Sequence, residues 1–172
     1  MTKSRIRQTC FADPEPMGHK KMQHNHMNLK PDVCPDEGGA MDYNLKPLHA
    51  RWIYKRGDIY LADLGPGEGS RQGGIRPVIN YQNNSANLHS TTMTMVPATS
   101  QIKRLDLPCH VFLGKEGHLK KDSMAMCEQL YTINKSQVLG YIGKLSRETM
   151  RKVDDGVEAH QGRYIPHELE AP

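Results

Sequence analysis

Five short stretches of strand-like composition follow one another between residues 57 and 130, and they limit the fold more than any other feature of the chain. Each combines β-branched, aromatic or other apolar residues, and turn-forming sequence separates them. The stretches are GDIYLADL (57–64), PVINYQN (77–83), TTMTMVPA (91–98), LPCHVFL (107–113) and SMAMCEQL (123–130). Since no long helical pattern lies between them, a parallel α/β sheet is disfavoured. The spacing predicts a small antiparallel barrel or sandwich.

Helical sequence is confined to the C-terminal part of the chain. Residues 135–140 (KSQVLG) predict one or two helical turns, and residues 145–160 (LSRETMRKVDDGVEAH) predict a longer helix. Ser146 suits the N-cap of the longer helix, and Glu148 places a negative charge in its first turn. Three apolar residues share one face of this helix, which we expect to pack on the core: Met150, Val153 and Val157.

The first fifty residues show neither strand nor helix periodicity, and Pro, His, Met and charged residues dominate them. This composition predicts a disordered tail at 1–50, one domain at 51–165 and a short C-terminal tail at 166–172. The N-terminal tail holds five possible zinc ligands, namely Cys10, His19, His24, His26 and Cys34. Their spacing matches no compact zinc motif, so we expect neither a metal nor a cofactor. A translation start at Met41 is an alternative.

Composition and charge indicate the cellular location and the kind of partner to expect. The formal net charge of +4 is compatible with an anionic partner such as RNA. No run approaches the roughly 18 apolar residues of a membrane span, and the polar start MTKSRIRQTC lacks the apolar region of a secretory signal. The four cysteines are scattered without a CxxC pair, which fits free thiols in a reducing cytoplasm. We therefore expect a cytoplasmic protein with no membrane partner.

The stretch GEGSRQGGIRPVINYQNN (67–84) places Gly73 and Gly74 just before an arginine that is itself followed by a proline. Pro77 biases Arg76 toward an extended backbone, and the glycines allow another backbone or a ligand to approach closely. A guanidinium held in this way at the start of a strand suits a phosphate. A solvated charge at a strand end is the alternative.

A series of segments in a specific order resembles the MazF/PemK family of toxin ribonucleases, from about residue 54 to residue 157. The segments are KRGDIYLADLGPGEGSRQGGIRPV, QNN, ATSQI, LPCHV and DSMAMCEQLYTINKSQVLGYIGKLS. The resemblance implies a mainly β fold with C-terminal helices, an SH3-like small antiparallel β-barrel, and a homodimer. It also implies an mRNA interferase: a sequence-specific endoribonuclease that cleaves single-stranded RNA through the 2′-hydroxyl without a metal. A cognate antitoxin would neutralise it, and the toxin–antitoxin complex would bind promoter DNA.

The same resemblance assigns the catalytic residues. The arginine of the family's GG-x-RP motif corresponds to Arg76, and the threonine at the end of the third strand corresponds to Thr99. Four polar residues are expected to contact RNA: Ser70, Arg71, Gln72 and Gln101. Some relatives have a histidine in place of Ser70, so a base from this loop is in question, and His110 is a possible general base.

Elementary chemistry supports these roles. The neighbouring 2′-hydroxyl of RNA is a nucleophile already in place, so the enzyme must stabilise the phosphorane and transfer protons. Arg76 suits charge stabilisation but is a poor base, because its pKa exceeds about 12. Two departures from the family pattern, Asn80 and Pro97, lie inside strands.

Other functions on this fold remain possible from the sequence. One alternative is a non-catalytic or degenerate homologue that binds antitoxin or nucleic acid, or a gyrase-type inhibitor. The joint presence of Arg76 and Thr99 favours the enzyme. A peptide-binding adaptor is less compatible with the composition, since the chain has only two Phe and one Trp to line an aromatic groove.

Overall fold

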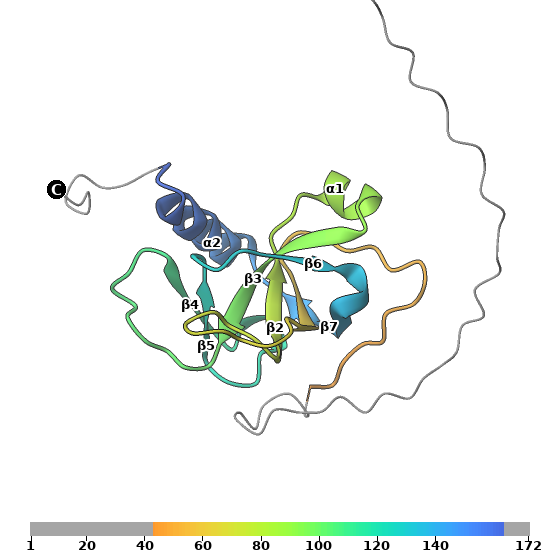
Figure 1. The fold of residues 1–172 in the computed structure, drawn as a ribbon, viewed down its shortest axis with the longest axis horizontal. Coiled ribbons are helices and arrows are strands. Elements are labelled where there is room, and N and C mark those ends of the chain that lie inside the picture. Colours follow the sequence, from red (N-terminus) through yellow and green to blue (C-terminus); the bar gives the residue numbers. More distant parts are fainter. Residues whose placement is uncertain (1–42, 164–172) are drawn as a thin grey trace, which may run out of the picture. The chain divides into compact units, whose positions relative to one another are not determined.

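The computed structural model of the chain describes residues 43–163, in which antiparallel strands form most of the fold and a long helix follows the last strand (Figure 1). The strands are β1 (Asp58–Asp63), β2 (Ile75–Asn80), β3 (Thr92–Thr99), β4 (His110–Gly114), β5 (Ser123–Met126), β6 (Tyr131–Asn134) and β7 (Val138–Lys144). The helices are α1 (Asn84–His89) and α2 (Arg147–His160), with 3₁₀ turns η1 (Glu116–His118) and η2 (Lys135–Gln137).

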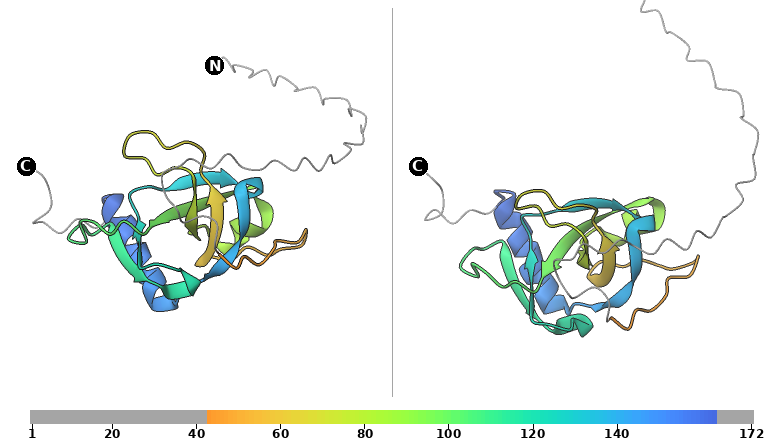
Figure 2. Two further views of the ribbon diagram at one scale, coloured as in Figure 1. Left: turned by 90° about the horizontal axis from the view of Figure 1, so that it is seen from below. Right: turned by 60° about the horizontal axis from the view of Figure 1, so that its bottom comes forward.

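Strand β3 joins the two parts of the sheet, whose order is β4-β5-β3-β2-β1-β7, with β6 also paired to β3. Its first half pairs with β6, its middle with β2 and its last two residues with β5. Strand β6 leads through η2 into β7, and β7 pairs with β1. The sheet formed by β7-β1-β2-β3-β6 is therefore strongly curved and barrel-like (Figure 2). The expected barrel-like antiparallel fold is confirmed.

The core is divided between the two faces of the strands. Along β1, Ile59 and Leu61 belong to one apolar cluster, whereas Tyr60 and Ala62 belong to the other. All four side chains are buried. A strand with two buried faces carries apolar residues at consecutive positions, and this explains why GDIYLADL lacks the alternation typical of a half-exposed strand.

Helix α2 begins as the sequence predicts. The Ser146 hydroxyl accepts a hydrogen bond from the Thr149 backbone N–H at 3.1 Å, and thereby caps one of the unpaired donors of the first turn. Met150, Val153 and Val157 are buried in the same cluster as Ile59. Helix α2 packs beside β4 (Figure 1). Among residues 43–163, no helix combines the length and apolar character needed to span a bilayer.

The structure differs from the sequence prediction at three elements. Residues 135–140 form the 3₁₀ turn η2 and the start of strand β7 instead of a helix, because alternate residues of β7 are buried against β1. Residues 84–89, expected as a turn, form the short helix α1, capped by the Asn83 side chain on the Ala86 N–H at 2.8 Å. Strand β6 was not predicted, since four residues carry little periodic signal.

The chain joins the barrel earlier than the predicted boundary at residue 50. Lys46 pairs with Tyr141 of β7 through two backbone hydrogen bonds of 3.1 and 3.2 Å. Tyr43, Leu45 and Leu48 pack against the apolar clusters. The predicted tail is therefore wrong for residues 43–50. The rest of it, with its possible zinc ligands, and the C-terminal tail lie outside the described residues.

The two departures from the family pattern are both buried. Asn80 is fully buried, and its side-chain N–H₂ donates to the Lys55 carbonyl at 3.1 Å. Its side-chain oxygen has no hydrogen-bond partner among the described residues, and an unpaired buried acceptor costs about 1–3 kcal/mol. Pro97 lies opposite Val78 in the middle of the sheet and is accommodated without interrupting the β2–β3 register.

Candidate active site

The loop between β1 and β2, residues 64–74, is folded tightly back on itself. A Cβ atom on Gly73 would lie 2.0 Å from the backbone nitrogen of Gly67, so only glycine fits there. Gly74 has φ +71°, a conformation that residues with a side chain rarely adopt, and its N–H donates to the Gly65 carbonyl at 2.6 Å. These two glycines close the base of the loop immediately before Arg76. The loop projects from one side of the barrel (Figure 2, left).

Arg76 is the second residue of β2 and lies opposite Ala62 of β1. Its guanidinium is held by its own loop: Nε donates to the Gly73 carbonyl at 2.6 Å, and Nη1 donates to the side-chain oxygen of Gln72. The residue is half-buried. The long side chain is therefore fixed by two hydrogen bonds and does not sample solvent freely, as the sequence predicts for this junction.

Thr99 is the last residue of β3, and 8% of its surface is exposed. Its hydroxyl oxygen accepts a hydrogen bond from the Gln101 N–H at 3.1 Å, which fixes the side chain at the strand end. In the β2–β3 pair Val78 lies opposite Pro97. Arg76 lies two residues before Val78 and Thr99 lies two residues after Pro97, so both lie toward the same end of this antiparallel strand pair.

The link between β5 and β6 anchors the β1–β2 loop. Gln129 uses both ends of its amide: its oxygen accepts from the Gln72 N–H at 2.8 Å, and its nitrogen donates to the Ser70 carbonyl at 3.0 Å. The Tyr131 hydroxyl donates to the Gln72 carbonyl. The Arg71 guanidinium carbon lies 5.2 Å from the centre of the Tyr131 ring, within cation–π range. Sequence reasoning missed Gln129 and Tyr131, because these contacts join residues almost sixty positions apart.

A pocket of about 480 Å³ lies between the loop and this link. Its lining consists of Ser70, Arg71 and residues 128–132. Two of the four predicted RNA-contacting residues thus face the pocket. Gln72 turns toward Arg76, and Gln101 is exposed beyond the end of β3.

His110, the possible general base, has partners at both ring nitrogens. Nδ1 lies 2.9 Å from the carbonyl oxygens of both Lys103 and Arg104, and Nε2 lies 3.4 Å from a carboxylate oxygen of Glu128. A partner on one ring nitrogen fixes the orientation of the ring, which both a structural histidine and a general base require. The role of His110 as general base stays a prediction.

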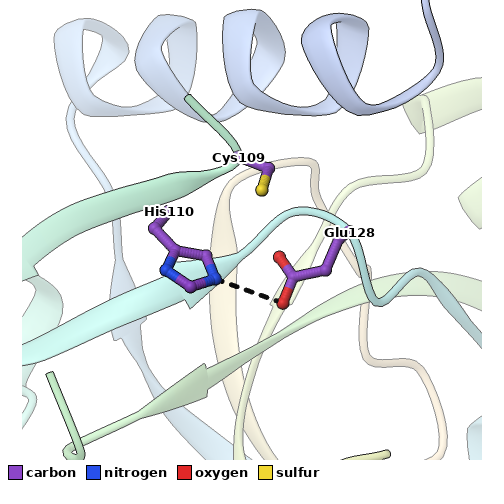
Figure 3. Close-up of side chains that lie close together, drawn as sticks. All are labelled: Cys109, His110 and Glu128. Atoms are coloured by element: carbon purple, nitrogen blue, oxygen red, sulfur yellow. Dashed lines mark ion pairs between the residues drawn. The ribbon is translucent and has the colours of Figure 1, made fainter. Parts of the chain in front are cut away.

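Cys109 lies beside His110 and Glu128, and the three side chains form a cluster at the start of β4 (Figure 3). Burial raises the pKa of the Cys109 thiol, and the negative charge of Glu128 raises it further. A thiol in this position stays protonated at neutral pH unless a cation compensates for the negative charge of its thiolate.

Three arginines near the site have different partners. Arg104 forms a bidentate ion pair with Asp106, with N–O distances of 2.9 to 3.1 Å, and this hydrogen bonding lowers the pKa of the Asp106 carboxyl. Its charge is largely balanced locally. Arg71 lies over the Tyr131 ring and Arg76 is held by Gly73 and Gln72, so both guanidinium groups lie on or beside the β1–β2 loop.

Solved structures of other proteins share this architecture. The fold is similar to a mycobacterial endoribonuclease in complex with its cognate antitoxin, with a TM-score of 0.55 and 23% sequence identity over 66% of this chain and 99% of that one. It is also similar to MazF from Deinococcus radiodurans, with a TM-score of 0.56 and 20% identity over 64% of this chain and 98% of that one. At these identities the comparisons establish the fold.

Sequence comparison establishes the family. Residues 55–160 match the profile of the PemK-like, MazF-like toxins of type II toxin–antitoxin systems. A curated relative named Endoribonuclease MazF, from Staphylococcus saprophyticus, is 38% identical over 111 residues, which is 64% of this chain and 92% of the relative. The chain belongs to the MazF endoribonuclease toxin family.

Proposed function

We propose that this chain is a toxin endoribonuclease that cleaves single-stranded RNA at short sequences, without a metal, through the substrate's own 2′-hydroxyl. The observation that carries the proposal is the position of Arg76 and Thr99 at neighbouring strand ends, with Arg76 fixed by Gly73 and Gln72. This arrangement preorganises a positive charge before the substrate arrives. With messenger RNA as the proposed substrate, we propose that the protein acts in the cytoplasm.

In the proposed reaction the 2′-oxygen attacks the adjacent phosphorus as its proton leaves, and the bond to the 5′-oxygen of the next nucleotide breaks as that oxygen gains a proton. Arg76 stabilises the extra negative charge on the non-bridging oxygens. Thr99 accepts the Gln101 N–H, so its own hydroxyl hydrogen can be donated to one of those oxygens. Losing one preorganised donor of this kind costs about 100–1000-fold in rate.

The pocket beside the loop is proposed to hold nucleotides next to the cleaved phosphate. Arg71 would contact phosphate, and the Tyr131 ring beneath it offers an aromatic surface on which a base could stack. Ser70, Gln72 and Gln101 supply hydroxyl and amide groups for base-edge hydrogen bonds, the readout that unpaired RNA allows. Sequence specificity would come from these polar groups and not from Arg76.

Cleavage of a short RNA by the purified chain in excess EDTA tests this chemistry. We expect full activity with EDTA, and no cleavage when the nucleotide 5′ to the scissile bond carries 2′-deoxyribose. Arg76→Ala and Thr99→Val should each lose about 100-fold or more in rate. Arg147→Ala, at an exposed position on α2, is the matched control and should retain the wild-type rate. Activity that disappears in EDTA and returns with Mg²⁺ would refute the metal-free mechanism.

We further propose that the toxin acts as a homodimer, that a cognate antitoxin covers the same basic surface, and that the complex of the two binds promoter DNA. An acidic antitoxin segment would compete with RNA for Arg71 and Arg76. A competition titration with a non-cleavable RNA analogue tests this: the two ligands should exclude each other, and antitoxin affinity should fall as salt rises. Simultaneous binding of both ligands to one site at full affinity would refute it.

A further inference from the structure

Three potential metal ligands of different chemistry meet at the start of β4. Cys109 Sγ, one ring nitrogen of His110 and one carboxylate oxygen of Glu128 all lie within 4.8 Å of one another. His110 and Glu128 face each other, with the Cys109 sulfur nearby (Figure 3). They come from two chain segments, the entry to β4 and the link that follows β5. Sequence reasoning, which expected no metal, considered only the histidines and cysteines of the N-terminal tail.

The hydrogen bonds of His110 set which of its nitrogens can act as a ligand. Nδ1 lies 2.9 Å from two carbonyl oxygens, which can only accept, so Nδ1 must carry a proton. In neutral histidine this leaves the lone pair on Nε2, 3.4 Å from the Glu128 carboxylate. Two acceptors at this distance repel each other unless a proton or a cation lies between them. An Nδ1–H donated to a backbone carbonyl is also the usual outer-shell partner of a metal-bound histidine.

Glu128 supplies a second, independent observation. Its other carboxylate oxygen is buried, and no nitrogen or oxygen donor reaches it among the described residues; the Cys109 thiol is the group that interacts with this carboxylate. A buried carboxylate with only a thiol beside it is costly, and a bound cation would remove that cost. Cys109 is the adjacent thiol, whose thiolate form a divalent cation would stabilise.

We propose that Cys109, His110 and Glu128 form a binding site for a zinc ion, with a fourth position left for water. The ligand set of one sulfur, one imidazole nitrogen and one carboxylate oxygen suits zinc, which accepts all three types in tetrahedral sites. For Zn–N and Zn–O bonds of about 2.0–2.1 Å, tetrahedral geometry sets the two ligand atoms roughly 3.3–3.4 Å apart. The observed Nε2–carboxylate separation of 3.4 Å matches this spacing.

The site would connect β4 to the link that anchors the candidate active site. Glu128 lines the pocket and is followed by Gln129, which holds the β1–β2 loop through Gln72 and Ser70. Zinc would fix Glu128 to the start of β4, whereas Gln129 holds the loop through its own two hydrogen bonds, so cleavage in EDTA is not expected to depend on the zinc. The site uses neither Arg76 nor Thr99, so the proposal does not depend on the cleavage mechanism.

Titration of the full-length, reduced chain with Co²⁺ tests the site, because thiolate-bound cobalt gives a charge-transfer band absent from oxygen-only sites. We expect one equivalent of Co²⁺ to produce the band, and Zn²⁺ to displace it. Cys109→Ser should abolish the band, and His110→Gln and Glu128→Gln should weaken Zn²⁺ binding by more than about 10–100-fold, the loss typical of outer-shell changes.

Matched controls separate this site from the N-terminal tail and from unfolding. The double variant Cys10→Ser/Cys34→Ser removes the tail thiols, and Glu148→Gln removes an exposed carboxylate on α2. Both should bind Co²⁺ and Zn²⁺ as the parent does. Circular dichroism identifies unfolded variants, and if Cys109→Ser does not fold, His110→Gln and Glu128→Gln decide the question. A band that survives in folded Cys109→Ser but disappears in the tail variant would overturn the proposal, as would the absence of any band in the parent chain.

Discussion

Gln129 is expected to control RNA cleavage although it lies outside the residues that the sequence singles out. Its amide makes two hydrogen bonds to the backbone of the β1–β2 loop, at Gln72 and Ser70. Gln129→Ala removes both and leaves the apolar clusters untouched. At about 0.5–1.5 kcal/mol each, the two bonds contribute roughly 1–3 kcal/mol to holding the loop in place. If cleavage requires the docked loop, this corresponds to a rate loss of about 5- to 150-fold.

Single-turnover cleavage of a short RNA at saturating enzyme measures this loss directly, and thermal unfolding reports the effect on stability. Gln82→Ala is the matched control, because Gln82 also bonds backbone groups, at Thr92 and Thr94, but at the end of β2 away from Arg76. We expect both variants to be destabilised and only Gln129→Ala to cleave slowly. Equal rates for Gln129→Ala and the parent would refute the view that this link positions the loop.

Three further predictions follow from individual contacts. A chain that starts at Met41 should keep the stability of the full chain, whereas one that starts at Arg51 should melt at a lower temperature. The shorter chain loses the Lys46–Tyr141 pairing and the packing of Leu45. Equal melting temperatures would refute this. Gly73→Ala should impair cleavage while the circular dichroism spectrum stays native, since a Cβ there would collide with the loop backbone at Gly67; a wild-type rate would contradict it. Burial opposes ionisation of Glu116, but hydrogen bonds from Thr149 and Ser146 lower its pKa below the ordinary value near 4.5. Its contribution to stability is therefore complete above pH 4.5 and is lost as the pH falls through the depressed pKa. Glu116→Gln should make the free energy of unfolding depend less on pH in that acidic range. An unchanged pH dependence would contradict this prediction.

The strands and the last helix could be predicted because their signals are local. Strand β1 combines β-branched and aromatic residues between turns, and α2 has a cap and an apolar stripe within one segment. Strand β7 could not be predicted in the same way. Its sequence, VLGYIGK, carries two glycines and no clear period, and it becomes a strand because β1 offers an edge to pair with. Pairing with β1, and not the local sequence preference, makes residues 138–144 a strand.

In the candidate site, too, features set by local sequence could be predicted and contacts between distant segments could not. The two glycines before Arg76 indicate a tight turn from the sequence alone, so the position of Arg76 at the start of a strand could be predicted. The anchoring of the loop by Gln129 could not, since it depends on contacts between distant segments. The sequence indicates His110 as a possible general base, but its carbonyl and carboxylate partners could not be predicted, because they lie on other segments of the folded chain.

The central claim is that this chain cuts RNA and that Arg76 is required. Sequencing of the 5′ ends of cellular RNA after brief expression tests it most directly, with Arg76→Ala as the comparison and Arg147→Ala as the matched control. The account predicts new ends that share a short sequence in cells expressing the parent chain or Arg147→Ala, and none with folded Arg76→Ala. The same ends in cells expressing folded Arg76→Ala would contradict the account.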